Sequence, residues 1–100
     1  MDVFPSVIRT LINEAGFRCV PDNPDVSTLH IEMRKPDGGW LGHLSIIIWY
    51  NPGLSVTIYD DGQCLASVDM SDPTACEQVI QIIKKRHQQK IDADYVGFGR

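Results

Sequence analysis

Residues 40–50 read WLGHLSIIIWY and contain the longest uninterrupted apolar run of the chain, residues 46–50. Side chains of an extended strand alternate between the two faces of a sheet, so even and odd positions point opposite ways. The apolar even positions are Trp40, Leu44, Ile46, Ile48 and Tyr50, and the apolar odd positions are Leu41, Ile47 and Trp49. The stretch therefore predicts a strand with one face in the core and a second apolar face that needs a cover or a partner.

Three flanking segments alternate more cleanly and predict further strands at residues 27–34, 54–59 and 63–68. Short turn sequences rich in Gly, Pro, Asn and Asp separate them, at residues 35–39, 51–53 and 60–62. Turns of this length connect antiparallel neighbours. We predict a four- to five-stranded antiparallel β-meander, the fifth strand depending on whether residues 17–20 join the sheet.

The register of the last hairpin has two solutions. A two-residue turn at Asp61-Gly62 pairs Ile58 with Leu65, whereas a three-residue loop with a left-handed Gly62 pairs Ile58 with Cys64. We favour the three-residue loop, because it turns Cys64 and the apolar residues that follow it, Ala66 and Val68, toward the core together.

Two helices flank the strands. Asp2 can cap the first helix, Pro5 suits its first turn, and Gly16 ends it. The second helix begins at Ser71-Asp72-Pro73, and its apolar stripe ends at Ile83. Basic and polar residues then extend it to about Lys90, and we expect residues 91–100 to form a tail that is flexible or bound to a partner. The apolar stripe of the second helix consists of Cys76, Val79, Ile80 and Ile83.

This element order predicts a single α+β domain over residues 1–100, with both helices packed on one face of the sheet. Five residues, each on the inward stripe of its own helix or strand, are expected to be buried together in the core: Ile12, Ile31, Ile46, Val56 and Ile80.

Composition fits such a domain, since 43% of the 100 residues are hydrophobic and 22% are charged. The apolar run at residues 46–50 is far shorter than the ~20 residues of a membrane-spanning helix, and the first residues lack the pattern of a signal peptide. The three cysteines are widely spaced and fall at expected core positions, which indicates reduced thiols. We therefore expect a cytoplasmic protein without a membrane partner.

The second apolar face is the main candidate for a binding site. With the registers above it combines residues from two adjacent strands: Leu41, His43, Ile47, Trp49, Thr57 and Tyr59. Exposed apolar patches with Trp and Tyr often mark protein contacts. Two alternatives stay open at this point: the second helix or the tail covers the face, or a second copy of the chain does.

A basic segment offers a different site. Residues 73–90 contain four cations and one acid in a chain whose net charge is −4. Phosphates of nucleic acid could bind there, although cations at a helix C-terminus also suit the helix dipole. The four cations are Lys84, Lys85, Arg86 and Lys90.

Signals for catalysis are weak. His30, Glu32 and His43 are expected on the outer sheet face, but their spacing matches no metal-ligand motif. No cysteine is predicted beside a histidine, and no glycine-rich phosphate loop occurs. We expect no metal, no cofactor and no enzymatic activity.

At the level of fold alone, such a small acidic domain resembles bacterial and phage accessory factors that bind a larger protein and block it, anti-CRISPR inhibitors of host defence complexes among them. We therefore predict a non-enzymatic protein-binding module or inhibitor, whose partner is another protein or a second copy of itself. The alternative is an accessory protein that contacts nucleic acid through the basic helix end.

Overall fold

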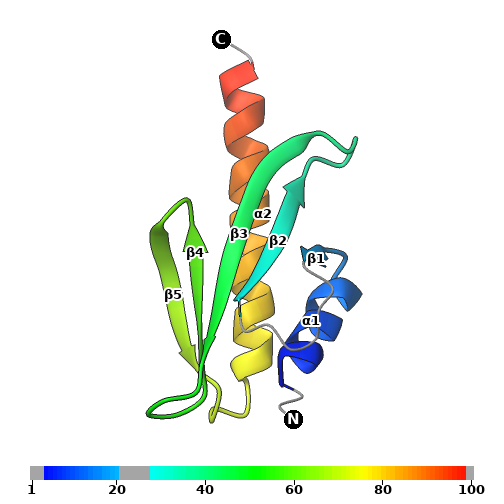
Figure 1. Cartoon of the computed structure of the whole chain (residues 1–100). Helices are drawn as coiled ribbons and strands as arrows, with labels where there is room; N and C mark the ends of the chain where they lie inside the picture. Colours follow the sequence, from blue (N-terminus) through cyan, green and yellow to red (C-terminus); the bar gives the residue numbers. More distant parts are fainter. Residues whose placement is uncertain (1–3, 21–27, 99–100) are drawn as a thin grey trace.

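A computed structural model describes residues 4–20 and 28–98 (Figure 1). Its elements are α1 (Phe4–Glu14), β1 (Arg18–Val20), β2 (Thr28–Arg34), β3 (Trp40–Trp49), β4 (Ser55–Asp60), β5 (Gln63–Asp69) and α2 (Ala75–Phe98). The strands form one sheet in the order β1-β2-β3-β4-β5, and every neighbouring pair is antiparallel. The predicted α+β meander is confirmed, with the short β1 as its fifth strand.

Both helices contribute to a single core against one face of the sheet. The core includes Ile8 and Ile12 of α1 and Val79 and Ile83 of α2, packed with the inward residues of β2, β3 and β4. Those inward residues are Leu29, Ile31, Met33, Leu44, Ile46, Ile48, Val56 and Ile58. Of the five predicted core residues, all but Ile80 are fully buried, and Ile80 is half-buried against the same cluster.

The ends of the helices follow local rules. At the end of α1 the amide of Phe17 donates to the carbonyl of Ile12 at 3.2 Å, across a left-handed Gly16 (φ +98°), which is a Schellman cap. At the start of α2 the Oδ1 atom of Asp72 accepts a hydrogen bond from the amide of Thr74 at 2.8 Å. Gly16 therefore ends α1 and Asp72 caps α2, as predicted. The predicted cap at Asp2 lies outside the described residues.

The prediction that the helix gives way to a tail after Lys90 is wrong, because α2 continues to Phe98. Between Ile83 and Lys90, polar contacts with the strands hold the helix on the sheet. His87 hydrogen-bonds to the carbonyl of Arg34 at 2.6 Å and packs edge-on against Phe17. Apolar periodicity could not reveal such contacts.

The predicted three-residue loop between β4 and β5 is also wrong. Asp60 pairs directly with Gln63, so Asp61 and Gly62 form a two-residue turn. Both turn residues have positive φ, 51° and 81°, as a type I′ turn requires.

A register shift in the same hairpin restores the expected inward face. Ile58 pairs with Ala66, and Leu65 is the extra residue, half-buried against the core. Ala66 and Val68 therefore keep the predicted orientation, but Cys64 does not and is exposed. The prediction of three core cysteines fails at this position, because the bulge reverses the parity of the residues before it.

A second bulge reorients the start of β3. Met33 of β2 pairs with Gly42, but the next residue, Arg34, pairs with Trp40, which leaves Leu41 as the extra residue. Trp40 consequently lies on the outer face and is 55% exposed, whereas Leu41 packs against the core. The predicted parity is wrong for both residues.

The other end of β3 also departs from the prediction. The strand ends at Trp49, and Tyr50, expected on the inner face, is exposed beyond it.

Neither helix in the described part of the chain combines the length and apolar character of a membrane span.

Candidate protein-binding face

The sheet has one face that neither helix covers. In β3 from residue 44 and in β4 up to residue 58, every second side chain belongs to the core. The side chains between them, which include Ile47, Trp49 and Thr57, therefore point away from the helices. Figure 1 shows α2 running along the opposite side of the sheet. The alternative that α2 covers the outer face is wrong, since its buried residues Val79 and Ile83 belong to the core on the other side.

We call Ile47, Trp49, Thr57 and Tyr59 the Trp49 patch. Ile47 lies directly opposite Thr57. Trp49 follows Ile47 by two residues on β3, and Tyr59 follows Thr57 by two residues on β4, so they are the next outward side chains on the two sides of that pair. Trp49 is 45% exposed, and Thr57 beside it is only 7% exposed. Four of the six predicted contact residues are therefore neighbours, as expected from the parity of β3 and β4.

Hydrogen bonds hold the Trp49 side chain in place. Its Nε1–H donates to Thr57 Oγ1 at 3.1 Å, and Thr57 Oγ1 is 3.3 Å from Ser67 Oγ on β5. The indole thus has a fixed orientation although nearly half of its surface is exposed. An exposed aromatic side chain that is already ordered loses little entropy on binding.

The remaining two predicted contact residues lie elsewhere. Leu41 packs on the core because of the bulge, and His43 is exposed near the far end of β3. His43 packs edge-on against His30, with ring centroids 5.3 Å apart, and His30 Nδ1 is 3.2 Å from Ser45 Oγ. Trp40 joins this end of the sheet, under the guanidinium of Arg34 at 5.0 Å.

Side-chain alternation predicted the wrong face of the sheet for Trp40, yet the sequence contains a residue that indicates the correct orientation. An isolated glycine inside a strand pattern indicates a bulge, and Gly42 has a φ of +101° that other residues rarely adopt. Reading Gly42 as a bulge would have reversed the orientation predicted for Trp40.

Among residues 4–20 and 28–98, the contacts at the histidine end match neither a metal site nor a nucleophile paired with a base. In the part of the chain that the structure describes, no group of three His, Cys, Asp or Glu side chains is placed to hold a metal ion. The Ser45–His30 contact is a cross-strand pair on an open surface, and His43 meets His30 ring edge to ring face. A nucleophile requires a base that a third group orients, and the contacts of His30 with other described residues, Ser45 and His43, supply none.

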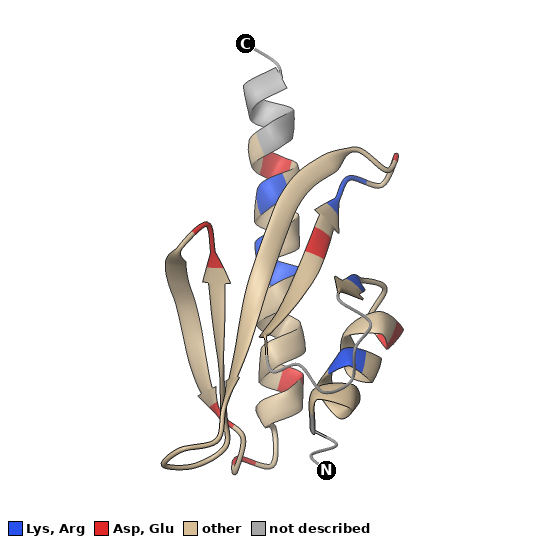
Figure 2. Cartoon of the chain, viewed as in Figure 1, with Lys and Arg blue, Asp and Glu red and all other residues tan. Residues whose placement is uncertain are grey.

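The basic end of α2 is partly neutralised within the fold. Asp60, 7% exposed, accepts Arg86 Nε at 2.7 Å and Lys90 Nζ at 3.1 Å. Figure 2 shows basic segments of α2 at about the level of the acidic β4–β5 turn. Burial alone would raise the pKa of Asp60, but the hydrogen bonds and charges of Arg86 and Lys90 outweigh it, so the pKa is lowered. Of the four candidate phosphate ligands, Lys84 and Lys85 are exposed.

Comparison with known proteins adds no relative: no family model, curated protein or solved structure matches this chain. The site must therefore be interpreted from its own geometry.

Proposed function

We propose that this chain is a non-enzymatic binding module that docks on another protein through the Trp49 patch. The supporting observation is the state of Trp49: it is 45% exposed, yet its indole N–H is held by Thr57. Trp and Tyr side chains that are rigid before binding are the typical anchors of protein interfaces.

The chemistry of the face indicates the kind of partner surface. β3 carries no charged residue, and the only one in β4 is Asp60, which contacts Arg86 and Lys90 of α2. A complementary surface would be apolar at its centre with hydroxyl or amide groups at its rim. A chain of this size would act by occupying a surface of a larger protein, as an inhibitor or accessory factor does. In the described part of the chain the three cysteines form no disulfide, which fits the reducing cytoplasm.

The nucleic-acid alternative has less support. Affinity for nucleic acid grows with the number of phosphates that are neutralised. Arg86 and Lys90 already pair with Asp60, and the chain as a whole carries a net charge of −4.

The test compares three versions of the protein as bait in a nuclease-treated lysate of the source cells: wild type, Trp49→Ala with Tyr59→Ala, and Trp40→Ala. Trp40→Ala is the matched control, because it removes an even more exposed tryptophan from the same strand. We expect a protein retained by wild type and by the control whose affinity for the double variant is weaker by more than about 2 kcal/mol.

Sedimentation over a range of concentrations separates the two kinds of partner. A wild-type dimer that the double variant cannot form would identify a second copy as the partner. If the double variant captures the same proteins as wild type and neither form self-associates, the proposal is wrong.

A further inference from the structure

A hollow of about 600 Å³ lies at the edge of the sheet where β1 begins. β1 covers only residues 30–32 of β2, so β2 continues past its neighbour toward the hairpin. The C-terminal turn of α1, the β2–β3 hairpin and α2 close the other sides. The hollow is lined by Gly16, Phe17, Arg18, Glu32, Arg34, Lys35, Pro36 and His87.

The charge of this hollow is opposite to that of the whole chain. Three of its lining residues, Arg18, Arg34 and Lys35, are cationic, and only Glu32 is acidic. With His87 neutral the lining has two positive charges in excess, although the chain carries a net charge of −4. An anion would therefore be attracted here and repelled by much of the remaining surface.

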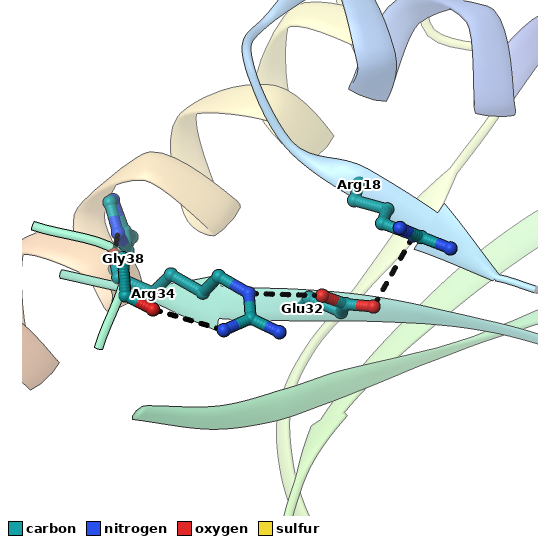
Figure 3. Close-up of polar contacts among 5 residues, drawn as sticks. Arg18, Glu32, Arg34 and Gly38 are labelled. Atoms are coloured by element: carbon teal, nitrogen blue, oxygen red, sulfur yellow. Dashed lines mark hydrogen bonds and ion pairs between the residues drawn. The ribbon is translucent and has the colours of Figure 1, made fainter. Parts of the chain in front are cut away.

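Two guanidinium groups converge on a single carboxylate in this hollow (Figure 3). Arg18 Nε is 3.4 Å from Glu32 Oε2, and Arg34 Nε is 3.1 Å from Glu32 Oε1. Arg34 also donates to the carbonyl of Gly38 at 3.0 Å and lies over Trp40. Glu32 can neutralise only one of the two guanidinium groups.

The two arginines differ in freedom. The Arg18 side chain is 73% exposed, and its one ion pair with a described residue, Glu32, is made through Nε. The Nη groups of Arg18 are therefore available to a ligand. Arg34 is held by Glu32, Gly38 and Trp40, so it presents a fixed edge of its planar group. Such a guanidinium pair suits the two oxygens of a carboxylate.

We propose that this hollow binds an acidic side chain of an extended peptide segment on a partner protein. Phe17 and Pro36 supply apolar walls for the body of the segment, and the hollow is large enough for a few residues. A carboxylate carries one charge and suits an excess of two positive charges. A nucleic acid would instead bring a row of phosphates against an acidic body. This site shares no residue with the Trp49 patch, so the two proposals can fail separately.

The test titrates the isotope-labelled full chain with an acetylated tetraglutamate peptide and follows backbone amide shifts by NMR. We expect saturable shifts at Gly16, Phe17, Lys35 and His87, and no saturable shifts with the matched tetraglutamine peptide. Raising the ionic strength from about 0.02 M to about 0.2 M should weaken binding several-fold.

Two variants and a matched control test the roles of the arginines. Arg18→Gln, a change at an exposed residue, should weaken binding by about five-fold or more. Arg34→Lys keeps the charge but removes the planar set of guanidinium N–H donors, and we expect it to weaken binding by a similar factor. Lys85→Gln removes one exposed cation on the β5 side of α2 and should change the dissociation constant less than about two-fold.

Three outcomes would overturn the proposal: no saturable binding of tetraglutamate, equal effects of Arg18→Gln and Lys85→Gln, or equal binding of tetraglutamine. Inorganic phosphate and a short DNA duplex are titrated in parallel. If either binds more tightly than tetraglutamate and depends on Arg18, the site is a phosphate site and the peptide proposal is wrong.

Discussion

Asp60 illustrates how one side chain connects the two layers of the molecule. It stands at the end of β4, is 7% exposed, and binds Arg86 and Lys90 on α2, at least 26 residues away along the chain. A buried carboxylate is costly unless it is paired, and here two cations lower its pKa despite the cost of burial.

We predict that Asp60→Asn lowers the free energy of unfolding by about 1–3 kcal/mol at pH 7, because two partly buried cations lose their counter-charge. Urea denaturation measures the loss. Asp61→Asn is the control: Asp61 is exposed, and asparagine tolerates its positive φ, so we expect a change below about 0.5 kcal/mol.

The same contact predicts the pH dependence. The pKa of Asp60 is lower in the folded state, so its contribution is present above the ordinary value of 3.8 and is lost as the pH falls through the lower folded value. The stability difference between wild type and Asp60→Asn should therefore shrink below about pH 4. A difference that stays constant down to pH 2 would contradict the assignment.

At the scale of elements, two bulges decide which side chains face outward. One lies opposite Met33 and Arg34 and turns Trp40 out and Leu41 in, and the other makes Leu65 the extra residue and exposes Cys64. The first bulge lies directly beside Gly42, which has a φ of +101°. Glycine is the residue that adopts this conformation without steric cost.

Gly42→Ala should destabilise the fold by about 1 kcal/mol or more, because alanine is strained at a φ of +101°. Space is not the cause, since the nearest atom to an added Cβ is Lys90 Nζ at 3.8 Å. Gly53→Ala is the matched control, with no positive φ and open space around it, and should be neutral. Thermal melts of the two variants with equal midpoints would show that the bulge does not depend on Gly42.

At the scale of the whole molecule, the chain is a two-layer structure with one open face. Adjacent residues of β3 report on the two sides of the sheet: Ile46 is fully buried beneath the helices, and Ile47 is half-buried on the outer face. The two residues have the same side chain and the same strand, so they form a natural pair for comparison.

Ile46→Ala should cost about 2–5 kcal/mol of unfolding free energy, because it leaves a cavity in a closed core. Ile47→Ala should cost less than about 1.5 kcal/mol, since water can occupy the space on the open face. Equal losses in denaturant titrations would mean that the outer face is covered in solution, for example by a second copy.

The sequence alone determined the element types, the meander order, the helix ends at Gly16 and Asp72, and the orientation of Ile47 and Trp49. These follow from side-chain alternation, capping chemistry and short turns, which act over a few residues. Only the tertiary structure decided the orientations of Trp40, Leu41 and Cys64, the length of α2, and the pairing of Arg86 and Lys90 with Asp60. A single extra residue in a strand reverses the parity beyond it, and polar contacts between distant elements leave no periodic pattern in the sequence.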